Sequence, residues 1–115
     1  MKEQLKEMGI PYEDVIDRFM GKEDFYFRML KKFPEDKNFE GLEQSVAQKD
    51  WSIAFKYAHT VKGICANLGL DNILEYVVPL TEELRNPPYE GEKIMKYFTD
   101  AAGAYQKTIE VIKNL

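Results

Sequence analysis

The sequence predicts an all-α protein. Apolar residues recur at spacings of three and four almost throughout the chain, which is the period of amphipathic helices. No stretch shows the alternation of β-branched residues that is typical of strands. The breaks between periodic segments coincide with proline or glycine, the residues that most often interrupt helices. A length of 115 residues fits a single domain over residues 1–115.

Six helices are expected, with approximate ranges 12–20, 22–33, 38–49, 51–68, 71–85 and 91–113. In the first three, the residues predicted to face inward are Val15, Ile16 and Phe19; Phe25, Met29, Leu30 and Phe33; and Phe39, Leu42 and Val46. Pro34 and the polar run after it separate the second helix from the third, because proline biases the preceding residue away from helix.

The last three helices carry longer apolar stripes. Their predicted inward residues are Ala54, Tyr57, Ala58, Val61, Ile64, Cys65 and Leu68; Ile73, Leu74, Val77, Leu80 and Leu84; and Ile94, Phe98, Ala101, Tyr105, Thr108 and Ile112. Gly69 and the sequence NPPYEG provide the two breaks between them. Four amphipathic helices with short loops pack most simply as an up-down-up-down antiparallel four-helix bundle, with one or two additional short N-terminal helices.

Composition narrows the classes of function. The net charge of −4 argues against a protein that binds nucleic acid or an anionic membrane surface. The single cysteine, Cys65, has no partner for an internal disulfide, which favours a reducing compartment. The N-terminal sequence lacks the apolar core of a signal peptide, and no apolar run approaches the length of a membrane span. We therefore expect a cytoplasmic protein.

The sequence AHTVKGICANLGL, residues 58–70, contains the only histidine. On a helical wheel of residues 52–68, His59 lies roughly 160° from the centre of the apolar stripe and therefore faces solvent. The other residues on this outer face are Ser52, Phe55, Lys56, Lys62, Gly63 and Ala66. A solvent-facing histidine most often has no function, so its neighbours decide the interpretation.

Gly63 lies one turn after His59, where glycine costs about 1 kcal/mol relative to alanine. Gly63 and Ala66 would leave bare backbone beside the imidazole for a second molecule; the alternative for Gly63 is a tight internal helix crossing. Lys62, at i+3, is placed to reach an anion on the imidazole, although for Lys62 taken alone a solvated surface lysine is the better explanation. Phe55 fits either a contact with an adjacent helix or a docking patch.

The motif AHTVKGICANLG resembles the signature of histidine-containing phosphotransfer (HPt) domains: Ala-His, then an apolar residue with Lys-Gly, then a glycine six residues further on. The resemblance extends over about residues 10–86. There, FYFRMLKKF, LEQSVAQKDWSIAFKYAHTVKG and LGLDNILEYVVPLTEELR are similar to the family in order and spacing.

The resemblance implies a helical bundle whose exposed histidine, His59, accepts a phosphoryl group from an aspartyl phosphate on a receiver domain and passes it to a response regulator. Lys62 would then steady the phosphoryl charge and Gly63 would admit the receiver. The helical wheel adds to the docking face Ser52, Phe55, Lys56 and Ala66. Some family members have a glutamine that bonds the imidazole near the position of Thr81; the threonine side chain is shorter, so we do not expect a direct bond from it, and Arg85 would lie close by.

The implied partners are receiver domains of response regulators and a hybrid sensor kinase, with this chain a monomer. The receiver would supply Mg²⁺, and this chain would bind no cofactor. A neutral imidazole, with an ordinary pKa of about 6.5, offers a ring nitrogen for attack at pH 7. The sequence contains no phosphate-binding loop of the GxxxxGKS type and has no room for a kinase domain, so we expect a phosphocarrier without ATP-dependent kinase activity of its own.

Other classes of function fit less well. A docking module that binds and sequesters a receiver or kinase domain without being phosphorylated would use the same face. A di-iron bundle needs Glu-x-x-His pairs, and the residue three before His59 is Lys56, so no metal site is expected. A hydrolase is disfavoured because Cys65 is predicted on the buried face of the helix that carries His59.

Overall fold

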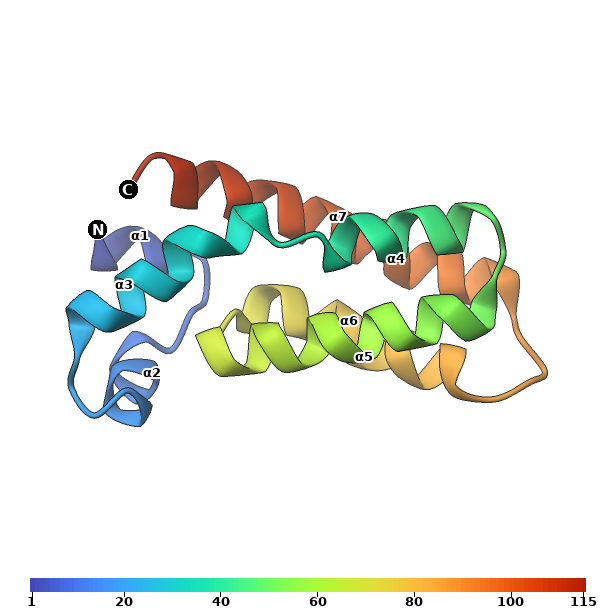
Figure 1. Ribbon diagram of the computed structural model, residues 1–115, viewed down its shortest axis with the longest axis horizontal. Helices are drawn as coiled ribbons and strands as arrows, with labels where there is room; N and C mark the ends of the chain where they lie inside the picture. Colours follow the sequence, from blue (N-terminus) through green and yellow to red (C-terminus); the bar gives the residue numbers. More distant parts are fainter.

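The chain folds into seven α-helices and one 3₁₀ turn, with no strand, in a computed structural model of residues 1–115 (Figure 1). The elements are α1 (Lys2–Glu7), α2 (Tyr12–Arg18), α3 (Glu23–Lys32), η1 (Phe33–Glu35), α4 (Asn38–Ala47), α5 (Trp51–Leu68), α6 (Asp71–Arg85) and α7 (Gly91–Lys113). The all-α prediction is confirmed. The predicted ranges of α5, α6 and α7 are also those of the structure, whereas α1 was not predicted.

Helices α4, α5, α6 and α7, the four long helices, lie along the 43 Å axis of the molecule (Figure 1). Helix α5 packs against both α4 and α6, and α6 packs against α7. Aromatic rings join α4 to α7: Phe39 stacks on Tyr105, with ring centroids 4.0 Å apart, and on Phe98, at 5.8 Å. The apolar stripes of these helices therefore meet in one core, and each long helix keeps a polar face outward.

Helices α4 and α5 approach closely at Gly41. A methyl group at this position would overlap the ring of Tyr57, so only glycine fits without movement of that ring. Sequence analysis did not identify Gly41, because glycine within a helix carries no signal of what lies opposite it. This close contact helps to hold α5 in place against the rest of the core.

The N-terminal helices pack at the end of α5. Gly69, which follows α5, has a φ of +71° and ends the helix in the left-handed conformation, as predicted. A side chain at Gly69 would overlap Val15 of α2. The Tyr26 hydroxyl on α3 donates to the Leu68 carbonyl at 2.8 Å, and Arg18 donates to the Ala66 carbonyl at 3.1 Å. Carbonyls that a helix end leaves free are thus satisfied by the N-terminal segment.

The predicted inward stripe of α3 requires a correction. Phe25 and Met29 are exposed, at 42% and 40%, whereas Tyr26 and Leu30 are fully buried. Leu30 and Phe33 are buried as predicted, and Tyr26 joins them at a regular helical spacing in place of Phe25 and Met29, so the inward face of the first turns of α3 is rotated by about one residue from the predicted one. This rotation arises because α3 packs over the end of α5, where Tyr26 reaches Leu68.

Candidate functional site

Helix α5 is fixed at both ends and along one face. The Asp50 side chain accepts a hydrogen bond from the Ile53 amide at 3.4 Å, which caps the N-terminus. The buried residues of α5 recur at spacings of four and three: Ala54, Ala58, Val61, Cys65 and Leu68. His59 directly follows a buried alanine and points away from this stripe, and it is exposed. The imidazole is therefore presented to solvent from a rigid helix.

The nearest aromatic neighbour of His59 is Phe55, one turn earlier on α5. The two rings stack with centroids 6.0 Å apart and planes inclined by 24°. Phe55 is half-buried and packs partly against the core, so its ring has a firm backing. The phenyl ring therefore supports one side of the imidazole and limits the directions from which a second molecule can approach it.

Gly63 lies one turn after His59 and is exposed, and beyond its chain neighbours and the backbone of its own helix nothing lies within 4 Å of the position that a Cβ would occupy. The internal helix crossing considered for this glycine is therefore absent, and the close crossing in this fold is at Gly41 instead. The packing of the fold does not need glycine at position 63, and its absent side chain leaves the surface beside the imidazole open. A partner's backbone or side chain has room to lie against it.

The other outer-face residues of α5 differ in their surroundings. Ser52 and Lys56 are exposed, and Lys62 is half-buried. Ala66 is also half-buried, and its carbonyl accepts the hydrogen bond from Arg18. The outer face thus offers exposed or half-buried side chains on both sides of His59.

Thr81 does not contribute its hydroxyl to this site. The residue is fully buried, and the hydroxyl donates to the Val77 carbonyl of its own helix at 2.7 Å. The glutamine-like bond to the imidazole that the resemblance implied near this position is therefore not made by Thr81.

Arg85 lies at the edge of the site. Its guanidinium is 5.2 Å from the centroid of the Phe55 ring, the arrangement of a cation–π contact. The same guanidinium pairs with Glu82, with Nη2 donating to Oε1 at 2.9 Å. The hydrogen bond and charge of Arg85 lower the pKa of Glu82, and the charge of Lys62 adds to this effect. Glu82 was not among the residues predicted for the site.

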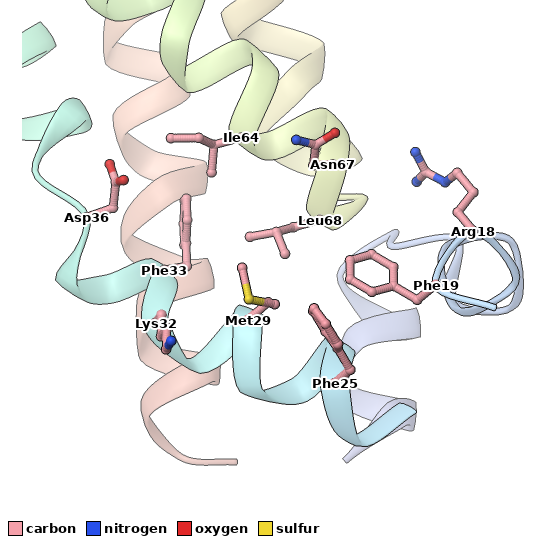
Figure 2. Close-up of a pocket in the computed structure, with 10 residues that line it drawn as sticks. All are labelled: Arg18, Phe19, Phe25, Met29, Lys32, Phe33, Asp36, Ile64, Asn67 and Leu68. Atoms are coloured by element: carbon pink, nitrogen blue, oxygen red, sulfur yellow. The ribbon is translucent and has the colours of Figure 1, made fainter. Parts of the chain in front are cut away.

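A cavity of about 480 Å³ opens between α3 and the last turns of α5 (Figure 2). The Phe19 and Phe25 rings and the Met29 side chain point into it, toward Leu68. Ile64, the residue directly after Gly63, and Asn67, one turn after Gly63, line it as well. The cavity was not predicted from the sequence because its walls come from segments far apart in the chain.

Other chemistry finds little support in the side chains. No group of three or more histidine, cysteine or acidic residues is arranged to hold a metal ion. Cys65 is fully buried, and burial raises the pKa of its thiol to about 12, so it is a poor nucleophile. No helix has both the length and the apolar character needed to cross a membrane.

Comparisons of the chain with models of protein families, with curated proteins and with solved structures found no match. The interpretation of the site therefore depends on the chemistry of its residues and on the motif around His59.

Proposed function

We propose that this chain is an HPt-like phosphocarrier whose His59 accepts a phosphoryl group from a receiver-domain aspartyl phosphate and passes it to a response regulator. The observation that carries the proposal is the pairing of His59 with Gly63: an exposed imidazole on a rigid helix beside a glycine that internal packing does not require. The motif of residues 58–69 adds the resemblance to the family.

The proposed scaffold is an antiparallel four-helix bundle of α4 to α7 in up-down-up-down order. The pairwise packing of α4 with α5, α5 with α6 and α6 with α7 supports this arrangement, as do the Phe39 contacts that join α4 to α7. The loops between these helices have only two to five residues, which favours antiparallel neighbours. Such a scaffold keeps His59 fixed while two different receivers dock in turn.

The proposed reaction transfers the phosphoryl group from the aspartate oxygen of the donor to a ring nitrogen of His59. The lone pair of a His59 ring nitrogen attacks phosphorus, and the P–O bond to the donor aspartate breaks to release a carboxylate. The surplus proton of the ring then passes to water. Onward transfer is the reverse reaction with the carboxylate of the response regulator. Because phosphoryl transfer depends mainly on in-line positioning and charge neutralisation, an exposed imidazole on a rigid helix is sufficient as the carrier.

Each residue of the outer face has a part in this proposal. Lys62, at i+3, would neutralise charge on the phosphoryl group. Gly63 would give the receiver access, with Ser52, Phe55, Lys56 and Ala66 in the docking face. Mg²⁺ would come with the receiver, whose acidic residues would hold it. The partners would be a hybrid sensor kinase and a response regulator in the cytoplasm.

The test is to incubate the chain with a ³²P-labelled phosphorylated receiver domain and to follow label on the wild type and on His59→Gln. We expect acid-labile, alkali-stable label on the wild type and none on the variant. Label retained by His59→Gln would disprove the assignment. If both proteins bind the receiver and neither accepts label, the chain is the docking module instead.

A further inference from the structure

The ion pair between Glu82 and Arg85 lies at the rim of the His59 site. Arg85 engages both carboxylate oxygens of Glu82, with Nη2 donating to Oε1 at 2.9 Å and Nε donating to Oε2 at 3.3 Å. The same guanidinium lies over the ring of Phe55, with Cζ 5.2 Å from the ring centroid, and Phe55 in turn stacks on His59. Arg85 is thus held one side chain away from the imidazole, with its hydrogen-bonding edge committed to Glu82.

The charge of Lys62 also acts on Glu82: it adds to the lowering of the pKa of this carboxyl, after the larger effects of the hydrogen bond and charge of Arg85. The carboxylate is therefore coupled to both cations that an anion on His59 would attract. In the unphosphorylated protein it balances part of their charge. A phosphoryl group on His59 would meet this carboxylate as a like charge.

The pair is easily broken. The side chains of Arg85 and Glu82 are 44% and 59% exposed, and exposed ion pairs contribute little to stability. A phosphoryl group carries more negative charge than a carboxylate and has three strong acceptor oxygens. Arginine binds phosphate through two parallel hydrogen bonds, so a phosphoryl group on His59 would compete successfully with Glu82 for Arg85.

We propose that Glu82 is a positioning residue of the phosphohistidine site: it holds Arg85 over Phe55 while His59 is free and yields Arg85 to the phosphoryl group when His59 is phosphorylated. This inference rests on the proposed function. The competition between Glu82 and the phosphoryl group for Arg85 makes phosphohistidine less stable than it would be with Arg85 fully available. The carrier therefore holds the group loosely enough to pass it on.

The test uses phosphoramidate as a chemical donor, so that no partner protein is needed. The His59 nitrogen attacks phosphorus, the P–N bond of the donor breaks and ammonia leaves. After removal of the donor, the first-order loss of phosphate is measured at pH 7. Loss requires protonation of the ring, which a nearby carboxylate favours and a nearby guanidinium opposes. We expect Glu82→Gln to lengthen the phosphohistidine lifetime about fivefold and Arg85→Gln to shorten it.

The double variant Glu82→Gln/Arg85→Gln shows whether Glu82 changes the phosphohistidine lifetime through Arg85 or by direct repulsion of the phosphoryl group. If Glu82 acts through Arg85, the double variant decays at the rate of Arg85→Gln alone. A lengthening that persists in full without Arg85 would show simple repulsion and overturn the positioning role. So would an unchanged or shorter lifetime in Glu82→Gln.

Glu90→Gln is the matched control, because Glu90, the residue before α7, forms another exposed i,i+3 pair, with Lys93 in the first turn of α7 at 3.4 Å. Its lifetime should equal that of the wild type. A wild type that takes no label on His59 means that the proposed function has failed. A labelled wild type with Glu82→Gln unchanged means that only this inference has failed.

Discussion

The ring of Phe55 stacks on the imidazole of His59, with the two ring centroids 6.0 Å apart, and the guanidinium carbon of Arg85 lies over the same phenyl ring, 5.2 Å from its centroid. One half-buried side chain thus connects the candidate nucleophile on α5 with a cation on α6. The spacing of four residues between Phe55 and His59 is visible in the sequence, whereas the contact between Phe55 and Arg85, thirty positions apart, is not.

Replacing Phe55 by alanine should strongly lower the rate of the proposed phosphorylation of His59 and only moderately lower the unfolding free energy. The half-buried ring should cost about 1–2 kcal/mol of unfolding free energy, below the range for a fully buried phenylalanine. Loss of the stacked ring should lower the rate of His59 phosphorylation about tenfold, because the imidazole loses its fixed orientation. The measurements are urea unfolding and label uptake from a phosphorylated receiver. Phe55→Leu is the control for burial; label uptake at the wild-type rate in Phe55→Ala would contradict the orienting role.

Gly63 and Gly41 form a pair of helical glycines with opposite expectations. Gly63→Ala should stabilise the protein by up to about 1 kcal/mol, because alanine favours helix and the site is open. Gly41→Ala should instead destabilise it by about 1–3 kcal/mol, because the new methyl group overlaps Tyr57. Thermal unfolding of the two variants measures the difference.

A bulkier side chain at position 63 tests the docking face. Gly63→Gln should fold as well as Gly63→Ala but lose more than tenfold in affinity for the receiver domain, because the side chain occupies the open surface beside His59. Isothermal titration calorimetry of the unphosphorylated pair gives the affinity. Equal affinity for the glutamine variant would place the interface elsewhere on the molecule.

The long helices and the outward direction of His59 were predictable because their signals are local. Helices α5, α6 and α7 combine regular apolar spacing with clear breaks, and burial follows that spacing. Helix α1 was missed because Leu5 is its only buried residue, and one apolar residue defines no period. On α3, Leu30 and Phe33 are buried as predicted, but Phe25 and Met29 are exposed, because the end of α5, and not the period alone, determines which residues face inward.

The missed parts of the site depend on contacts between helices. Glu82 and Arg85 form an i,i+3 pair within α6, and this pair is linked to the His59 site only because the packing of α6 on α5 brings Arg85 over Phe55. The cavity beside Ile64 needs residues from three segments of the chain. Thr81 occupies a position that the resemblance linked to the imidazole, but burial and its bond to Val77 remove it from the surface. Such facts follow from packing and carry no sequence period.

Gly69 should be intolerant of substitution for two separable reasons. Its φ of +71° penalises any side chain, and a Cβ would overlap Val15. Gly21 has a similar φ of +75° but open space around it, so Gly21→Ala measures the backbone cost alone, about 1–2 kcal/mol. Gly69→Ala should cost clearly more in urea unfolding. In the double variant Gly69→Ala/Val15→Ala, the loss of unfolding free energy should be smaller than the sum of the losses in the two single variants. A loss equal to that sum would show that the overlap with Val15 contributes nothing to the cost of Gly69→Ala.

Alkaline pH should destabilise the protein through Cys65. Burial raises the pKa of this thiol to about 12, above its ordinary value of about 8.5 in an unfolded chain. Between these values the unfolded state has lost the proton and the folded state keeps it, so the folded state binds more protons and stability falls as pH rises. The contribution of the Cys65 thiol to the unfolding free energy is complete below about pH 8.5 and declines by about 1.4 kcal/mol per pH unit above it. Tyr26, whose pKa burial raises to about 12, adds a smaller decline above pH 10.

Urea unfolding between pH 7 and 11 should therefore show a midpoint that falls as the pH rises, and the midpoint of Cys65→Ala should fall less steeply. Equal slopes in the two proteins would mean that the thiol ionises as readily in the folded state as in the unfolded one.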